Sequence, residues 1–392
     1  MKNQSLPPQA ESTAVTLTRQ LIQIDSSDPG AYEGEIGTFI TARLNDMGVE
    51  IITDEVLPGR SNIMGRIPGE IDDPALIYIC HMDTVTLGDG WSVPPLSALE
   101  RDGRIYGRGA CDMKSGLACA LSAFSKIAAM AASGQKPRHT ICLIATVDEE
   151  DFMRGVEAAI RAGWVTKDSW ILDMEPTNGQ IQVAHKGRTW FELTVQGATA
   201  HASTPWKGAD AIASMAEMIV KIRDRIQACP PHPELGRSTV TFGQINGGYR
   251  PYVVPDSCTV CIDMRLVPPT DTNAAAAIVN DAIRHGEAAV PGTHGAYLIT
   301  GDRPYVEKDD HSYLLAQLAA AHQKITAERA AVTYFPGYTD TAVIAGILHN
   351  HNCMSYGPGD LELAHKPDES VPIEDILRCE QVLTALALQI LY

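Results

Sequence analysis

The spacing of apolar residues divides this chain into extended and helical segments. The continuous apolar run at 75–80 is typical of a strand buried on both faces of a parallel sheet, and the segments at 139–147 and 170–175 are expected to be two more such strands. Apolar residues that recur every three to four positions predict helices. One of these helices ends at Gly48, because glycine is a favoured residue at the C-terminal cap of a helix. The helices are expected as a pair within 14–47, and then at 114–132, 208–228, 271–287, 309–322 and 372–391.

The pattern changes near residue 180 to strict alternation of apolar and polar residues, which is typical of half-exposed antiparallel strands. The alternating segments are 181–195, 239–245 and 258–267. Buried strands and helices return near residue 303. We therefore expect an α/β domain from 1–185 and 303–392, with a mixed, mostly parallel sheet flanked by helices. A smaller α+β domain, with an antiparallel sheet and two helices, is inserted at 186–302.

Polar side chains follow the first buried strand, at the carboxyl end where open α/β sheets place their chemistry. His81 and Asp83 are two residues apart, so in an extended chain they project to the same side. A carboxylate beside an imidazole is a common way to fix the tautomer of a metal ligand. The pair is short, however, and two unrelated polar residues at a solvated strand end would look the same.

Acidic residues end the other two buried strands. Residues 148–151 are four consecutive acids, which repel one another unless a cation neutralises some of them. A solvated loop remains the alternative for Asp148 and Asp151, whereas Glu149 and Glu150 are expected to point opposite ways. The third strand brings Asp173 and Glu175. Three strands that each deliver such groups to one sheet edge predict a shared site.

A glycine turn at 107–116 presents a single carboxylate, Asp112, just before the helix at 114–132. Taken alone, Asp112 is best explained as a helix cap. A dinucleotide loop would need a third glycine at this position, and a carboxylate would repel phosphate. His365 lies in a Gly/Pro-rich loop before the last helix.

These candidates together have the composition of a two-metal site. Two imidazoles and several carboxylates suit a pair of divalent ions, zinc first, with cobalt or manganese as alternatives. Asp112 is the natural carboxylate to bridge the two ions, and Glu149 is free to take a proton from water. The residues alone leave Asp173 and Glu175 as alternative ligands.

Composition and charge narrow the partners and the compartment. A formal net charge of −17 argues against nucleic acid and anionic membranes. Residues 1–13 are polar and predict no signal peptide, and no stretch reaches the roughly 20 apolar residues of a membrane span. Nine scattered cysteines suit buried thiols in the cytoplasm, and Cys258 and Cys261 are expected to be core residues.

The chain resembles the family of acetylornithine deacetylase, succinyl-diaminopimelate desuccinylase, aminoacylase and carboxypeptidase G over nearly its whole length. Six short motifs support the resemblance, and their order and spacing are specific. They are His81-Met-Asp83-Thr-Val, Gly107-Arg-Gly-Ala-Cys-Asp112-Met-Lys-Ser-Gly116, Asp148-Glu149-Glu150, Glu175-Pro-Thr with Ala184-His-Lys-Gly187, Gly197–Pro205, and Ala364-His365.

The resemblance implies a role for each matched residue. His81 and Glu175 would hold one zinc, Glu150 and His365 the other, and Asp112 would bridge them. Glu149 would be the general base for two-metal-activated water, with Asp83 orienting His81. The inserted domain would be a lid and dimerisation domain, whose His201 stabilises the oxyanion in the other subunit of a homodimer. The implied reaction is hydrolysis of the amide of an N-acyl amino acid.

Three further residues are candidates for contacts with the substrate. Arg265 resembles the family's arginine for the substrate carboxylate, with an ion pair to Asp263 as the alternative. Tyr252 and Tyr338 depart from the smaller family residues near the substrate, which suggests a larger or more aromatic substrate. A dipeptidase or glutamate-type carboxypeptidase is the nearest competing function. A catalytically dead binding scaffold and a nucleotide-binding oxidoreductase are more remote.

Overall fold

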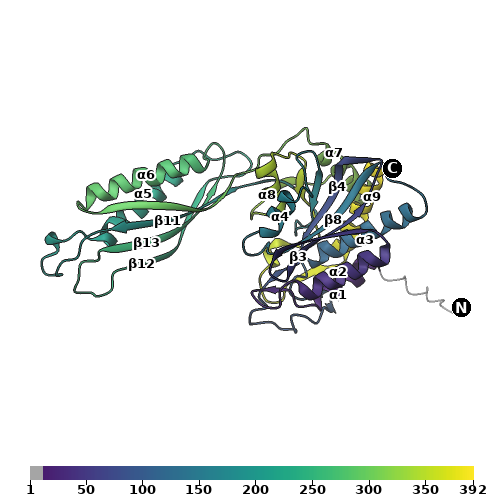
Figure 1. Cartoon of the computed structure of the whole chain (residues 1–392), viewed down its shortest axis with the longest axis horizontal. Helices are drawn as coiled ribbons and strands as arrows, with labels where there is room; N and C mark the ends of the chain where they lie inside the picture. The colour runs from purple at the N-terminus through teal and green to yellow at the C-terminus, as the bar shows by residue number, and fades with distance from the viewer. Residues whose placement is uncertain (1–11) are drawn as a thin grey trace. The chain divides into compact units, whose positions relative to one another are not determined.

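The computed structural model describes residues 12–392, which form two compact units (Figure 1). The first unit takes the described chain up to Val183 together with Lys308–Phe335 and Thr339–Tyr392. The second unit is Ala184–Glu307 with Pro336–Tyr338. Each unit has a hydrophobic core of its own. The polar N-terminal segment, for which no signal peptide is expected, lies outside the described residues up to residue 11.

An eight-stranded mixed sheet forms the centre of the first unit, in the order β15-β10-β16-β9-β4-β8-β3-β2. Strands β16, β9, β4 and β8 are parallel to one another, so their carboxyl ends lie at one edge of the sheet. The expected mixed sheet is confirmed; its parallel part is these four strands, whereas β10, β3 and β2 are joined by antiparallel pairs. The strands are β2 Glu50–Leu57, β3 Arg60–Ile67, β4 Ile71–His81, β8 His139–Thr146, β9 Trp170–Asp173, β10 Ile181–His185, β15 Val332–Phe335 and β16 Cys353–Ser355.

Helices flank this sheet because alternate strand residues are apolar on both faces. On one face α1, α3, α7 and α9 pack together over Leu76, Tyr78 and Cys80 of β4. Helices α4 and α8 pack against each other and against other strands of the sheet. The helices of this unit are α1 Thr13–Ile22, α2 Gly34–Met47, α3 Lys114–Ala132, α4 Arg154–Arg161, α7 Tyr313–Thr326, α8 Asp340–Leu348 and α9 Ile373–Leu391.

Helix α3 is the one described helix with the length and apolar composition of a membrane span. Of its most apolar window, 67% is buried inside the protein. It packs between α1 and α9, and Leu117, Leu121 and Phe124 are fully buried there. The apolar stripe of α3 is therefore accounted for by the core of the first unit.

Short elements join the loops around the sheet edge. Strand β1 Ser27–Asp28 pairs in parallel with β5 Thr84–Val85, directly after His81 and Asp83. A three-stranded sheet in the order β17-β7-β6 joins distant segments of the chain. Its strands are β6 Leu99–Arg101, β7 Arg104–Tyr106 and β17 Ser370–Pro372. A single-turn helix lies at Leu361–Leu363 in this unit, and another at Pro205–Lys207 in the second unit.

The second unit is a four-stranded antiparallel sheet in the order β12-β13-β11-β14, with α5 and α6 on one face (Figure 1). Alternate residues of β11, including Phe191, Leu193 and Val195, are buried against these helices. The residues between them lie on the other face, which we call the open face. The elements are β11 Gly187–Gln196, α5 Ala211–Gln227, β12 Thr239–Gly247, β13 Ser257–Leu266, α6 Thr272–Ala289 and β14 His294–Arg303.

Three sequence expectations differ from this structure. The predicted strand at 181–195 is two strands, β10 and β11, which belong to different sheets. Strand β14 is not predicted, because it is an edge strand whose residues are mostly exposed and so lack an apolar alternation. Cys261 is half-buried on the open face, because residues three apart in a strand face opposite ways and Cys258 faces the core.

Candidate metal centre

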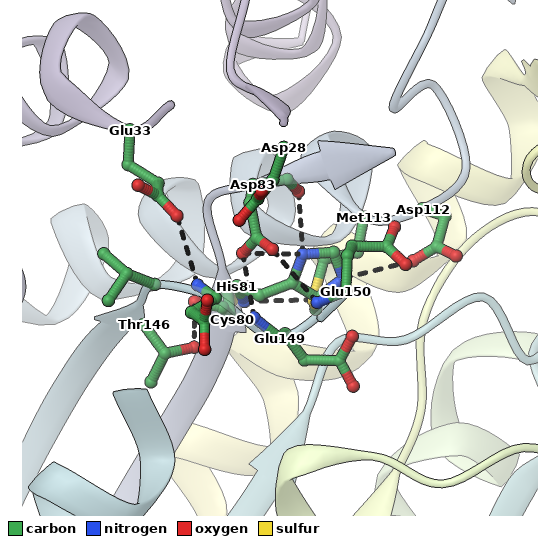
Figure 2. A network of polar contacts seen from close by, with 12 residues as sticks. Asp28, Glu33, Cys80, His81, Asp83, Asp112, Met113, Thr146, Glu149 and Glu150 are labelled. Carbon is green, nitrogen blue, oxygen red and sulfur yellow. Dashed lines mark hydrogen bonds and ion pairs between the residues drawn. The ribbon is translucent and has the colours of Figure 1, made fainter. Parts of the chain in front are cut away.

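His81 ends β4 at the carboxyl edge of the parallel strands and is buried. Its Nδ1 lies 2.9 Å from the backbone carbonyl oxygen of Asp83, to which it can donate a hydrogen bond. Its Nε2 lies 3.1 Å from Oδ1 of Asp112 (Figure 2). A carbonyl acceptor at Nδ1 leaves Nε2 as the nitrogen available to a metal ion.

Asp112 lies between two histidines. While its Oδ1 faces His81, its Oδ2 lies 3.2 Å from Nε2 of His365. The expectation that Asp112 caps helix α3 is wrong, because Met113 is the N-cap residue and no side chain caps this helix. The carboxylate is thus turned away from the helix and toward the two imidazoles.

Glu150 completes the contacts of His365. Its two carboxylate oxygens lie 3.2 and 3.0 Å from Nε2 of His365. Ligand atoms of His81, Asp112 and Glu150 lie within 4.8 Å of one another, and so do those of His81, Glu149 and Glu175. These overlapping groups place both imidazoles and four carboxylates in one site.

The protonation of these groups reflects a surplus of buried negative charge. Burial and the neighbouring carboxylates raise the pKa of Glu149 and Glu175 well above the usual range, although His81 opposes this. Burial is outweighed at Asp112, because the two imidazoles lower its pKa. Hydrogen bonds to Asp112 and Glu150 raise the pKa of His365 to about 10. In the absence of metal ions, the raised pKa values favour protons that offset the negative charge of these carboxylates. Bound cations would offset the same charge and release those protons.

Asp173 and Glu175 have different surroundings, although both follow β9. Oε1 of Glu175 lies 3.9 Å from Nε2 of His81. Asp173 belongs to neither group of potential ligands, and its Oδ2 is buried without a hydrogen-bond partner. Burial and the nearby Asp340 raise its pKa well above the usual range. The geometry therefore favours Glu175 as the metal ligand.

The carboxylate of Asp83 contacts the acidic turn more closely than it contacts His81. It lies 3.8 Å from Nδ1 of His81, whereas its oxygens accept the backbone N–H groups of Glu149 and Glu150 at 3.2 and 3.0 Å. In Figure 2, dashed lines join the carboxylate of Asp83 to His81 and to the backbone nitrogens of these two glutamates. The backbone of Asp83 thus orients the histidine, while its side chain holds the turn.

Glu33 and Arg60 support the same turn, and the sequence gives no sign of their role. Glu33 accepts the backbone N–H of Asp148 at 3.1 Å and pairs with Arg60 through both of its oxygens, at 2.5 and 2.6 Å. Asp148 is completely buried and pairs with Arg154 at 2.6 Å, so the solvated-loop alternative is wrong for this residue. Asp151 is exposed.

Glu369 is a second supporting residue that sequence reasoning does not identify. Its Oε1 accepts the backbone N–H groups of Cys111 and Asp112 at 3.0 and 3.1 Å. Its other oxygen accepts from Arg108 at 2.7 Å. Glu369 is almost fully buried and follows the loop of His365, so it joins that loop to the Asp112 turn.

The other predicted site residues belong to the second unit. His201 is exposed, and its Nδ1 accepts the backbone N–H of Ser203 at 3.2 Å. Tyr252 is exposed, whereas Tyr338 is buried and donates its hydroxyl proton to the carbonyl of Pro304 at 3.1 Å. Arg265 pairs with Asp263 at 2.8 and 3.1 Å, which is the structural alternative considered for it.

Comparisons with known proteins agree with this fold. A profile of the peptidase family M20/M25/M40 matches residues 77–389. A probable succinyl-diaminopimelate desuccinylase of Staphylococcus epidermidis is 26% identical, covering 92% of this chain and 94% of that protein. An acetylornithine deacetylase of Myxococcus xanthus is 28% identical, covering 87% and 84%. The solved YXEP protein of Bacillus subtilis, described as a dinuclear metal-binding peptidase, matches with a TM-score of 0.69 at 18% identity over 96% and 97%.

Proposed function

The chain belongs to the peptidase family M20/M25/M40, a family of hydrolases of amide and peptide bonds, and from this premise we propose that it is a metal-dependent deacylase of N-acyl amino acids or similar small amides. The observation that carries this proposal is the position of Asp112, whose two oxygens face Nε2 of His81 and Nε2 of His365. A carboxylate placed in this way is suited to bridge two metal ions.

The donor set fits two divalent ions, most simply zinc, with cobalt and manganese as alternatives. We assign His81 and Glu175 to one ion, Glu150 and His365 to the other, and Asp112 to both. Such ions polarise an amide carbonyl and lower the pKa of water. Each ligand is a nitrogen or oxygen donor of this chain that faces the same site.

Glu149 is the proposed general base. It is nearly fully buried, lies beside His81 and Glu175, and is not needed as a ligand. Its carboxylate takes the proton from the attacking water and returns it to the leaving amine. Because Nδ1 of His201 accepts a backbone N–H, its Nε2 carries the ring proton in the neutral form and can donate to the oxyanion.

The test separates the base from the bridging ligand. Glu149→Ala should lower kcat by at least about a thousandfold, because one group both accepts and returns the proton, while metal content measured by elemental analysis stays unchanged. Asp112→Ala should lose metal, because both ions share that ligand. Full turnover in the Glu149 variant, or full metal content in the Asp112 variant, would remove these residues from the roles assigned here.

A dipeptidase or glutamate-type carboxypeptidase is the second candidate. It is favoured by the structural likeness to a protein described as a peptidase, since water attacks the same type of bond. A kcat/KM panel of N-acyl amino acids and dipeptides on the metal-loaded enzyme separates the two functions. Small aliphatic N-acetyl amino acids as the best substrates would argue against a role for Tyr252 and Tyr338 in admitting a larger group.

We further propose a cytoplasmic homodimer formed through the second unit, in which His201 acts in the partner subunit. All nine cysteines are free thiols, which is consistent with a reducing compartment. The exposed position of His201 leaves its ring available to another chain. Small N-acyl amino acids or short peptides are the proposed ligands, with neither nucleic acid nor membrane as a partner.

A further inference from the structure

Three arginines lie side by side across the sheet of the second unit. Arg188 on β11 is directly opposite Arg265 on β13 and directly opposite Arg303 on β14. All three therefore share the open face, at the end of the sheet where the chain enters this unit at Ala184. Like charges directly opposite one another destabilise a sheet. Three adjacent cations repel one another even though the net charge of the chain is −17, so an anion beside them would stabilise this row.

The protein supplies that anion for one end of the row. Both oxygens of Asp263 face Arg265, and one of them also accepts the indole N–H of Trp190 at 3.0 Å. No carboxylate of the described residues pairs with Arg188, and its guanidinium donates no hydrogen bond to them. The central arginine of the row therefore lacks the two-oxygen pair that Asp263 makes with Arg265.

Two aromatic rings hold Arg188 in place. Its guanidinium carbon lies 4.3 Å from the centroid of the Trp190 ring and 5.8 Å from that of the Tyr338 ring. Rings in these positions restrain the plane of the guanidinium and leave its N–H groups to a ligand. Burial and the guanidiniums of Arg265 and Arg303 lower the pKa of Arg188, although Asp263 opposes this, so a further negative charge beside Arg188 would be stabilising.

We propose that Arg188 is a specificity-determining residue that binds a carboxylate of the substrate through its paired N–H donors. This inference rests on the proposed amide hydrolysis, and it adds that the preferred substrate carries a carboxylate that Arg188 recognises. Arginine is suited to this role because its planar fork matches the two oxygens of a carboxylate. Arg265, which is already paired with Asp263, is less available for it.

Two substrate pairs test the proposal on the metal-loaded enzyme. An N-succinyl amino acid is compared with its N-butyryl analogue, and an N-acyl amino acid with its carboxamide. In at least one of these pairs, the substrate with the carboxylate should have a kcat/KM about 10- to 100-fold higher than its uncharged analogue. This ratio corresponds to the free energy of a hydrogen bond to a charged group. Arg188→Gln should bring that ratio close to one, and Arg188→Lys should retain part of it.

Arg284→Gln is the matched control, because it removes the same charge from an exposed position on α6 of the same unit. This variant should keep the wild-type preference. If the wild-type enzyme shows no preference in either pair, or Arg188→Gln keeps the wild-type ratio in both, the assignment of Arg188 is wrong. The pair that responds locates the carboxylate on the acyl group or on the amino acid.

A binding measurement separates this inference from the proposed function. Succinate should raise the melting temperature of the wild-type and Arg284→Gln proteins more than that of Arg188→Gln, even if no amide is hydrolysed. Absence of turnover with all substrates would then contradict the deacylase and leave the anion site supported. A rise with inorganic phosphate that depends on Arg188, without one for succinate, would overturn the choice of a carboxylate.

Discussion

At the scale of single residues, the same charge can be stabilised or suppressed depending on its neighbours. The pKa of Asp112 is lowered although the residue is buried, because an imidazole faces each of its oxygens. Glu149 is buried among other carboxylates and holds its proton more strongly. This difference suits a permanent ligand in the first case and a proton carrier in the second.

His185 makes a testable contribution to the pH dependence of stability. Burial lowers its pKa from 6.5 to about 3. Between these values the unfolded chain binds a proton that the folded chain does not, so stability falls as the pH drops. His185→Gln should remove about 2 kcal/mol of the stability difference between pH 7 and pH 5, measured by urea unfolding.

The control for His185 is His294→Gln, which replaces an exposed histidine of the same unit. Each variant is compared with the wild-type protein at both pH values, so a general loss of stability cancels from the difference. An unchanged pH dependence in His185→Gln would show that the folded protein takes up this proton after all.

At the scale of elements, the turn after β8 is held by buried carboxylates along its backbone. Three successive N–H groups, those of Asp148, Glu149 and Glu150, are accepted by Glu33 in the first case and Asp83 in the other two. The proposed base and one proposed metal ligand therefore lie on a segment whose backbone is fixed by other residues of the chain.

Glu33→Gln tests this support. The variant loses the two-oxygen pair with Arg60, so the turn should loosen and kcat should fall about 10- to 100-fold. KM and metal content should change little, because the hydrogen-bond partners of the Glu33 carboxylate, Arg60 and the backbone of Asp148, are not proposed metal ligands. Steady-state kinetics and elemental analysis measure these effects.

Glu50→Gln is the control variant for Glu33→Gln. Glu50 lies on β2, beside the strand β3 that holds Arg60, and it makes an exposed carboxylate–arginine pair with Arg66 at 2.7 Å. The kinetics of this control variant should match those of the wild type. A fall in metal content equal to the fall in kcat would show that Glu33 stabilises the site as a whole and does not position the turn.

The elements also show which features a sequence reveals. The apolar runs of β4, β8 and β9 predict parallel strands whose carboxyl ends share an edge, so His81, the acidic turn and Glu175 are expected together. Glu33 and Glu369 are not expected there, because their hydrogen-bond partners lie 115 and 258 positions away in the sequence. No periodicity of the sequence connects residues at such separations. Strand β14 is missed for another reason, since an exposed edge strand needs no apolar alternation.

At the scale of the whole molecule, two units with separate cores divide the proposed tasks. The first unit contains every proposed metal ligand, and the second contains His201 and Arg188. Because each unit buries its own apolar residues, a substitution on the open face of the second need not disturb the ligands of the first. The two sets of residues can therefore be varied separately.

Mixed dimers test whether His201 acts in the partner subunit. Glu149→Ala and His201→Ala should each be inactive, yet their refolded mixture should recover about a quarter of wild-type activity. About half of the dimers then contain one subunit of each variant. In each of these dimers, one of the two sites has both Glu149 and the partner subunit's His201, so about a quarter of all sites are intact. A mixture of Glu149→Ala with the double variant should stay inactive. Mixed dimers that are formed but inactive would place His201 in its own subunit's site.

The contact of Glu369 with the Asp112 turn also sets an order of events during synthesis on the ribosome. The N–H groups of Cys111 and Asp112 gain their acceptor only when a residue 258 positions after Cys111 has been made. At 5–20 residues per second, this takes roughly 13–50 s. Binding of metal ions by Asp112, the proposed bridging ligand, is therefore expected to be a late step. In a chain that stalls before Glu369 is made, the turn that holds Asp112 would lack this hydrogen-bond acceptor.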